Sequence, residues 1–166
     1  MIAYRIEEDD LTREVVRALV ALHLDAMHEH SPPESIHALP VEHLRAPGVS
    51  FYTAWDGETL AAMGALKQLD PRHGELKSMR ASPAYRGKGA GRAMLRHLIA
   101  EARARGYARV SLETGSGEAF EPALGLYASE GFVECGPFAD YRAGDPFSRF
   151  LTLDIGTKEK RRSGRY

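Results

Sequence analysis

One stretch of this sequence decides the fold: Ser82-Pro83-Ala84-Tyr85-Arg86-Gly87-Lys88-Gly89-Ala90-Gly91. It follows a segment with the pattern of a strand, residues 75–81, and leads into a segment whose apolar residues fall on one helical stripe. Because glycine lacks a Cβ, backbone N–H groups of this loop can approach a ligand closely. The helix N-terminus that follows favours a bound anion. The stretch therefore predicts a strand, a diphosphate-binding loop and a helix in series.

Two common phosphate-binding motifs do not fit this loop. Lys88 is followed by Gly89, whereas the lysine of a P-loop NTPase is followed by Ser or Thr. Arg92 stands where a dinucleotide-binding fingerprint has its third glycine. Neither ATP nor NAD is therefore favoured.

The remaining sequence patterns place this loop within an α/β chain of the order βα(α)βββαβαββ. Strands are predicted at residues 2–6, 50–55, 59–69, 75–81, 109–114, 132–138 and 147–155. Helices are predicted at residues 12–28 and 120–129 and from the glycine loop to Gly106, with a short one at 41–45. The first of these should pack through Val15, Val16, Leu19, Leu22 and Ala26. We expect one domain over residues 1–155 and a solvated basic tail over 156–166.

Composition excludes several classes of function. The 22 Lys and Arg residues nearly balance 23 Asp and Glu, so we expect no nucleic-acid or membrane partner. No apolar run approaches the roughly 20 residues that cross a bilayer. Cys135 is the single cysteine, which rules out an intramolecular disulfide and fits a cytoplasmic location. The histidines have no spacing typical of a metal site, so no metal is predicted.

With these elements in order, residues 86–91 resemble the R-x-x-G-x-G/A coenzyme A motif of the GNAT N-acetyltransferase superfamily, and the likeness runs from about residue 2 to 155. Within that superfamily, the stretches at residues 31–39, 72–80 and 137–141 resemble the bacterial YsnE-type subgroup. The resemblance implies a single-domain fold with a mixed, mostly antiparallel sheet flanked by helices. It also implies that acetyl-CoA is the co-substrate.

The resemblance assigns cofactor-binding roles to two adjacent segments. The backbone of the strand end would pair with the pantetheine arm like an added strand. The loop and the first residues of the helix would hold the pyrophosphate. The residues concerned are Met79, Arg80, Ala81, Arg86, Gly87, Lys88, Gly89, Ala90, Gly91 and Arg92.

Acetyl transfer to an amine needs a group that accepts a proton from the amine and a group that protonates the thiolate. By resemblance, Glu75 is the candidate base, although it also suits a solvated partner of Lys77. Alternation along the strand puts Glu75, Lys77 and Met79 on one face. Tyr127 lies in a stretch similar to the family motif A-x-x-L-Y-x-x-x-G-F and is the candidate acid; the alternative is a tyrosine that only packs. Phe120 departs from the family, which often has Asn there to contact the cofactor.

Family members line the acceptor site with the first helices, the central strands and the last hairpin. The resemblance therefore nominates His28, Ser35, His37, Lys77, Thr114 and Asp140 as acceptor-binding residues. The main hypothesis is that the acceptor is a small molecule with a primary amine. If Lys77 and an imidazole face inward, an amino acid or related carboxylate-bearing amine would suit the pocket. The expected reaction is direct attack in a ternary complex, because Cys135 has no nearby histidine and is expected to be a small buried residue.

Two other functions remain open at this point. One is acetylation of a protein N-terminus or lysine, which would need an open groove near residues 32–39. The other is a non-catalytic sensor that binds coenzyme A without turnover. Family members often dimerise, so a homodimer is an alternative to a monomer.

Overall fold

The computed structural model describes residues 2–156, and its elements follow the predicted order. The predicted tail lies outside the described residues, apart from Gly156. The strands are β1 (Arg5–Glu8), β2 (Val49–Asp56), β3 (Thr59–Asp70), β4 (His73–Ala81), β5 (Arg109–Gly115), β6 (Val133–Glu134) and β7 (Ser148–Asp154). The α-helices are α1 (Glu14–His30), α2 (Val41–Leu44), α3 (Ala90–Ala104) and α4 (Glu121–Ser129). Short 3-10 turns are η1 (Pro33–Ser35), η2 (Pro83–Tyr85) and η3 (Glu118–Phe120).

The strands form one seven-stranded sheet in the order β1-β2-β3-β4-β5-β7-β6. Every neighbouring pair is antiparallel except β4 with β5, so the predicted mixed, mostly antiparallel sheet is confirmed. The tight turn between β2 and β3 uses Gly57 at φ +58°, as the Asp56-Gly57 pair predicts. Gly106, at φ +81°, similarly ends α3.

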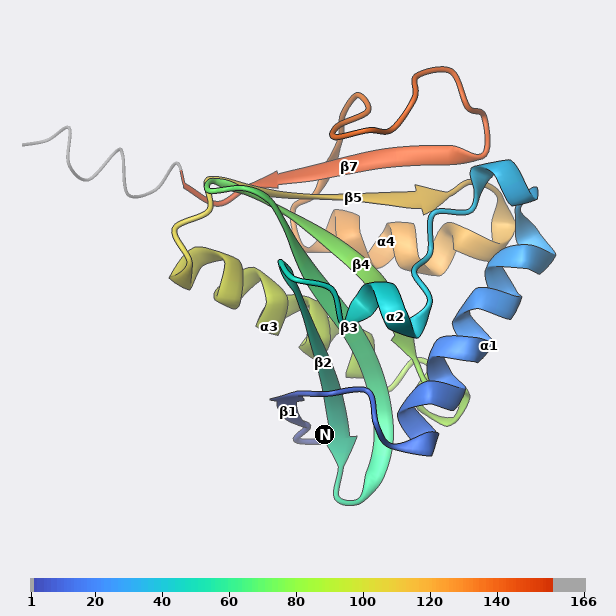
Figure 1. Cartoon of the computed structure of the whole chain (residues 1–166), viewed down its shortest axis with the longest axis vertical. Coiled ribbons are helices and arrows are strands. Elements are labelled where there is room, and N and C mark those ends of the chain that lie inside the picture. The colour runs from blue at the N-terminus through green and yellow to red at the C-terminus, as the bar shows by residue number, and fades with distance from the viewer. Residues whose placement is uncertain (1, 157–166) are drawn as a thin grey trace, which may run out of the picture.

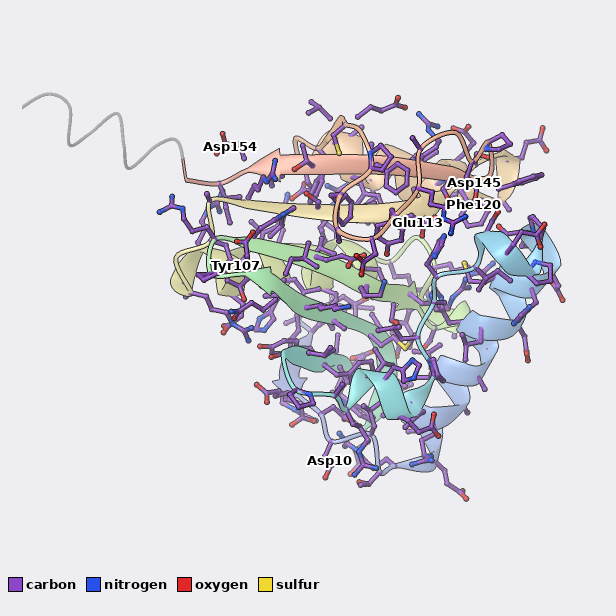
Figure 2. The ribbon with its side chains drawn as sticks, turned by 45° about the horizontal axis from the view of Figure 1, so that its top comes forward. Asp10, Tyr107, Glu113, Phe120, Asp145 and Asp154 are labelled. Carbon is purple, nitrogen blue, oxygen red and sulfur yellow. The ribbon has the colours of Figure 1, made fainter. Side chains whose placement is uncertain are left out.

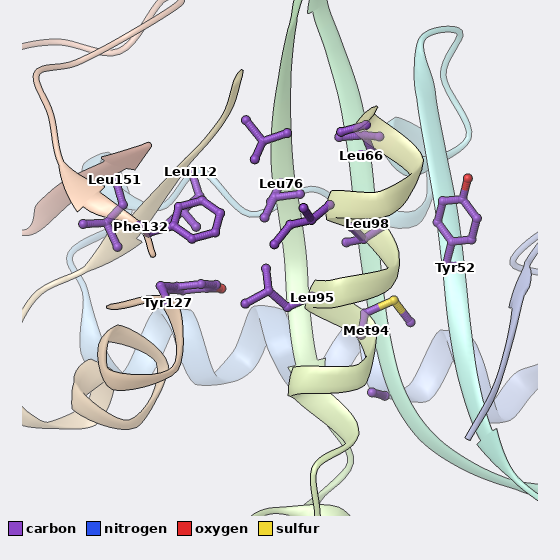
Figure 3. Close-up of a cluster of buried hydrophobic side chains, with 14 of the residues drawn as sticks. Tyr52, Leu66, Leu76, Met94, Leu95, Leu98, Leu112, Tyr127, Phe132 and Leu151 are labelled. Atoms are coloured by element: carbon purple, nitrogen blue, oxygen red, sulfur yellow. The ribbon is translucent and has the colours of Figure 1, made fainter. Parts of the chain in front are cut away.

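Helices cover both faces of the sheet (Figure 1). On one face α3 packs through Met94, Leu95, Leu98 and Ala102, all fully buried in a cluster that reaches Tyr127 of α4 (Figure 3). Each fully buried leucine stabilises the fold by about 1.5–3 kcal/mol. On the other face α1 and α2 pack on Phe51 and neighbouring residues in a second cluster. Within residues 2–156, none of the helices is long and apolar enough to cross a membrane.

The parallel pair β4 and β5 separates soon after it begins. Only His73, Gly74 and Glu75 pair with β5, although β4 continues to Ala81. Figure 1 shows the two strands side by side at one end and well apart at the other. The half of β4 that does not pair with β5 therefore borders a gap in the sheet, and this gap positions the functional site.

Three local predictions were wrong. The first strand starts at Arg5 rather than at residue 2, and the predicted strand at 132–138 shrinks to Val133–Glu134. The chain leaves the sheet at Gly136-Pro137 because proline has no N–H to donate to a neighbouring strand. Cys135 is consequently half-buried and lies just outside β6.

The third error concerns the packing face of α1. Val15 and Leu22 are 50% and 37% exposed, whereas Val16, Leu19, Val20 and His23 are buried. Apolar residues occupy both sides of this helix at helical spacing, so periodicity alone did not identify the side that faces the sheet. His23 lies on the buried side of this helix, which the periodicity did not indicate.

Candidate active site

A cavity of about 1000 Å³ opens where β4 and β5 separate. It is lined by the end of β4, the glycine loop and the start of α3 on one side, and by α1, the segment after it and the end of β5 on the other. Fourteen of the residues that the sequence nominated line it: Ser35, His37, Lys77, Met79, Arg80, Ala81, Arg86, Gly87, Gly89, Ala90, Gly91, Arg92, Thr114 and Tyr127.

Four nominated residues lie outside this lining. His28 is exposed on α1, and Lys88 is exposed with its Nζ 5.6 Å from the centre of the Tyr85 ring. Asp140 lines a separate hollow of about 740 Å³. Glu75 is buried behind the cavity and 2% exposed.

The glycine loop has the geometry of an anion cradle. Gly87 and Gly89 adopt φ +74° and +84°, conformations that side-chain-bearing residues rarely take. No side chain caps α3, and helix geometry leaves the N–H groups of Ala90, Gly91 and Arg92 without an intrahelical acceptor. These donors lie at the N-terminal end of α3, where the helix dipole favours negative charge. The residues present therefore fit a diphosphate.

The basic side chains near the cradle differ in how far their charges are already neutralised. Arg92 donates to Glu130 at 2.5 Å and to Ser129 at 2.9 Å, so its charge is largely paired. Arg80 donates through Nε to His23 Nδ1 at 2.7 Å. Burial lowers the pKa of His23 to about 3, so that imidazole is neutral. Among the described residues, no carboxylate forms a salt bridge with Arg80, which leaves a positive charge available to an anion.

The end of β4 does not alternate as predicted. β3 pairs Met63 with Arg80 and Ala65 with Lys77, so two residues of β4 lie opposite the single residue between them on β3. This bulge reverses the alternation beyond it. Met79 packs with the cluster under α3, whereas Arg80 reaches α1. The prediction that Met79 shares a face with Glu75 and Lys77 was therefore wrong.

The end of the cavity away from the cradle is built around a buried polar cluster. Glu75 Oε2 accepts hydrogen bonds from the Tyr141 hydroxyl at 2.5 Å and from Lys77 Nζ at 3.2 Å, and Lys77 also reaches the Tyr141 oxygen at 3.0 Å. The ring of His37 meets the Tyr141 ring edge-on, with centroids 4.9 Å apart. Burial, then the nearby Lys77 charge, lowers the pKa of His37.

Two chain segments meet beside this end of the cavity, and only the first, at residues 31–39, contributes to its lining. Ser35, in the segment after α1, donates to Asp145 Oδ2 at 2.7 Å. Asp145 and Tyr141 both belong to the loop between β6 and β7. The segment at residues 31–39 and the loop at 135–147 are thus joined by a hydrogen bond and by the contact between His37 and Tyr141. We call them the two covering segments.

Glu113 is the main functional candidate that the sequence did not nominate. It lies on β5, lines the cavity and is close to Asp145 (Figure 2). Burial raises its pKa to about 7, and the charges of Glu75 and Asp145 add to the rise while Lys77 opposes it. A carboxyl group that titrates near neutral pH suits proton transfer. The sequence nominated its neighbour Thr114 as an acceptor-binding residue. The strand pattern gave no sign that the Glu113 side chain is removed from water.

Tyr127 is 6% exposed and packs against Phe132, with the ring planes tilted by 60° and the centroids 5.7 Å apart. Figure 3 shows its ring next to both Phe132 and the α3 residue Leu95. Burial raises the pKa of its phenol above the ordinary value, so the hydroxyl group stays protonated at neutral pH. Such a group can donate a proton but does not act as a resting base. Among the described residues, no three His, Cys, Asp or Glu side chains form a group that could hold a metal ion.

Comparison with known proteins agrees with this arrangement. The family model described as the acetyltransferase (GNAT) family matches residues 15–132. The chain is 56% identical over 150 residues to YsnE of Bacillus subtilis, described as an uncharacterized N-acetyltransferase; the match covers 90% of this chain and 99% of YsnE. It is 51% identical to YedL of Escherichia coli, with the same description, over 92% of this chain and 95% of YedL.

Solved structures of lower sequence identity share this fold. A solved structure of an acyl-CoA N-acyltransferase from Klebsiella pneumoniae superimposes with a TM-score of 0.72 at 28% identity, covering 91% of this chain and 97% of that one. A Bacillus subtilis acetyltransferase solved in complex with CoA gives 0.66 at 21% identity, over 92% and 99% of the two chains. Sequence, fold and these relatives agree that the chain is an acyltransferase and belongs to the GNAT acetyltransferase family, among YsnE-type members.

Proposed function

We propose that this enzyme transfers acetyl from acetyl-CoA to the primary amine of a small molecule, by direct attack while both substrates are bound. The observation that carries the proposal is the continuity of the cavity: the cradle for a diphosphate and the covered polar end share one space of about 1000 Å³. A cofactor held at the cradle and extending along the unpaired half of β4 would present its thioester to that polar end. The single cysteine suits a reducing cytoplasm, where we place the reaction.

The chemistry assigns one proton-transfer role to each of two side chains. Glu113 lines the cavity and is the stronger candidate for the base, because a pKa of about 7 leaves much of it ionised at neutral pH. Glu75 was nominated for this role, but its Oε2 already accepts from Tyr141 and Lys77. We assign Glu75 to holding those two residues in place. Tyr127 protonates the departing thiolate.

The covering segments favour a small acceptor over a protein substrate. Their hydrogen bond between Ser35 and Asp145 ties the segment at residues 31–39, where a peptide would need an open groove, to the loop at 135–147. Within the covered end, Glu75 pairs with Lys77, and Glu113 and Asp145 add negative charge. This balance attracts an ammonium group. An acceptor that also carries a carboxylate would find its counter-charge at Arg80, which lacks an acidic partner among the described residues.

Release of free thiol from acetyl-CoA tests the proposal. Purified enzyme is mixed with acetyl-CoA and a panel of amines, amino acids and peptides. We expect release that depends on a small amine and falls at least roughly tenfold in Tyr127→Phe and Glu113→Gln. Tyr107→Phe and Glu118→Gln are matched controls: Tyr107 is a buried tyrosine bonded to Gln68, Glu118 is exposed, and neither lines the cavity.

The alternatives give different results. A preference for peptides would favour protein acetylation. Calorimetric binding of CoA without release by any acceptor would favour the non-catalytic sensor. Failure to bind CoA at all would refute the assignment of the cradle.

A further inference from the structure

Ser78 has a backbone conformation that its sequence does not explain. It lies in the β4 bulge, where two residues of β4 stand opposite Gly64 of β3. Its φ is +54°, in the left-handed region that residues with a Cβ rarely occupy. Such conformations persist when the surrounding structure enforces them, and they cluster at functional sites. Gly64 has a related constraint: a Cβ there would lie 2.7 Å from Met79 Sδ.

The hydroxyl group of Ser78 is the second unusual feature. The residue is 8% exposed, and its Oγ is buried without a hydrogen-bond partner among the described residues. A hydroxyl group removed from water and left unpaired is unfavourable, so native proteins rarely keep one without a role. It can donate one hydrogen bond. A ligand oxygen close to the bulge would satisfy it.

The position of Ser78 indicates which ligand oxygen this is. The residue lines the cavity and lies on β4 between residues of its two ends. On one side, Lys77 is bound into the cluster of Glu75 and Tyr141. On the other, the chain runs on to Ala81 and the glycine loop. If the cavity performs the proposed acetyl transfer, on which this inference rests, the acetyl group must lie between the cradle and the covered end, which is beside Ser78.

We propose that the Ser78 hydroxyl group donates a hydrogen bond to the carbonyl oxygen of the acetyl group and stabilises the negative charge that develops there. As the neutral amine attacks, a C–N bond forms and the carbonyl π pair moves onto the oxygen that Ser78 faces. As that pair returns, the C–S bond breaks and its electrons leave with sulfur. In net terms one proton passes from nitrogen to sulfur. Stabilisation of such charge by a fixed donor is a large term in acyl transfer.

Two substitutions at this position separate the hydroxyl group from the backbone. Ser78→Ala removes the hydroxyl group and keeps a Cβ, and Ser78→Gly removes both while favouring the positive φ. We expect kcat to fall on the order of 10²-fold in both variants, the usual effect of losing one such donor. Thermal unfolding of Ser78→Gly should occur at or above the wild-type temperature. Affinity for CoA, which lacks the acetyl group, should stay within about twofold of wild type in both.

Infrared spectroscopy of bound acetyl-CoA labelled with ¹³C at the carbonyl tests the contact without an acceptor. A hydrogen bond weakens the C=O bond, so the band should lie at lower frequency in wild type than in either variant. An identical band in all three proteins overturns the proposal, as does wild-type turnover by Ser78→Gly. A rise in KM for the amine with an unchanged band would mean that Ser78 contacts the acceptor, which also overturns it.

The design separates this proposal from the proposed function. If acetyl-CoA binds and no amine is acetylated, the band shift still decides whether Ser78 contacts the carbonyl. If acetyl-CoA does not bind to the wild-type protein, both proposals fall. Should Ser78→Ala fail to fold, Ser78→Gly gives the same comparison without the strained Cβ.

Discussion

Replacing Glu113 with glutamine removes a half-buried ionisable group while keeping the size of the side chain. The pKa of Glu113 rises from 4.5 to about 7, chiefly because burial disfavours the ionised form. The folded protein therefore keeps a proton that the unfolded chain releases between these pH values. Its free energy of unfolding must fall as pH rises through this window, and the loss is complete above about pH 7.

The size of this loss follows from the shift. At 1.36 kcal/mol per pKa unit, ionising Glu113 costs the folded state about 3 kcal/mol, an upper bound because the side chain is partly exposed to solvent. Glu113→Gln should therefore be more stable than wild type at pH 8, by up to that amount, and equally stable at pH 4. Urea denaturation at a series of pH values measures both.

The activity of the wild-type enzyme should increase as pH rises, whereas its free energy of unfolding decreases. If Glu113 is the base, kcat/KM rises through an apparent pKa near 7 in wild type, because only the carboxylate accepts a proton. Glu113→Gln should lose that rise and fall on the order of 10²-fold on the plateau. The same amine is used for both proteins, so its own ionisation cancels. A variant as active as wild type at every pH would remove Glu113 from the mechanism, and an unchanged stability slope would refute the argument from burial.

Three further changes test other parts of the site. Tyr127→Phe should lower kcat at least roughly tenfold with little change in KM, as steady-state kinetics will show; a raised KM alone would indicate a packing role. Gly89→Ala should weaken CoA binding and destabilise the fold by about 1 kcal/mol, because the φ of Gly89 is +84°. The control Gly125→Ala lies inside α4, where an added Cβ has nothing within 4 Å. It should stabilise the fold by a similar amount. Calorimetry and thermal melts compare the two. Tyr141→Phe should cost about 1–3 kcal/mol in urea denaturation, because Glu75 and Lys77 lose a buried partner; a cost near zero would show that water replaces the hydroxyl.

The order and bounds of most elements could be predicted from the sequence, whereas the side-chain arrangement inside the site could not. Asp56-Gly57, the glycine loop and Gly106 each specify a local backbone geometry, so the elements they delimit were predicted correctly. The bulge at Ser78 gives no such signal, since serine has no preference for positive φ. That single residue reverses the side on which Met79 and Arg80 lie.

The remaining omissions concern long-range contacts. Tyr141 meets Glu75 across 66 positions of the chain, and Ser35 meets Asp145 across 110. Local patterns cannot reveal such pairs. The raised pKa of Glu113 likewise depends on burial by distant segments, so a strand pattern shows its face and not its environment.

The bond between Ser35 and Asp145 belongs to the acceptor end of the proposed site. The sequence of that end can change in evolution at a different rate from the sequence of the cofactor end. In the proposed function, the cofactor end comes from one continuous segment, residues 79–92, in which a local backbone geometry must be kept. In the same proposal, part of the acceptor end comes from the surface segment at residues 31–39, which bonds to the loop at 135–147 outside the sheet. Substitutions in those loops can therefore alter which amine is accepted while the donor side stays constant. A fixed donor module beside an exchangeable acceptor module would let a family of close relatives spread over many substrates.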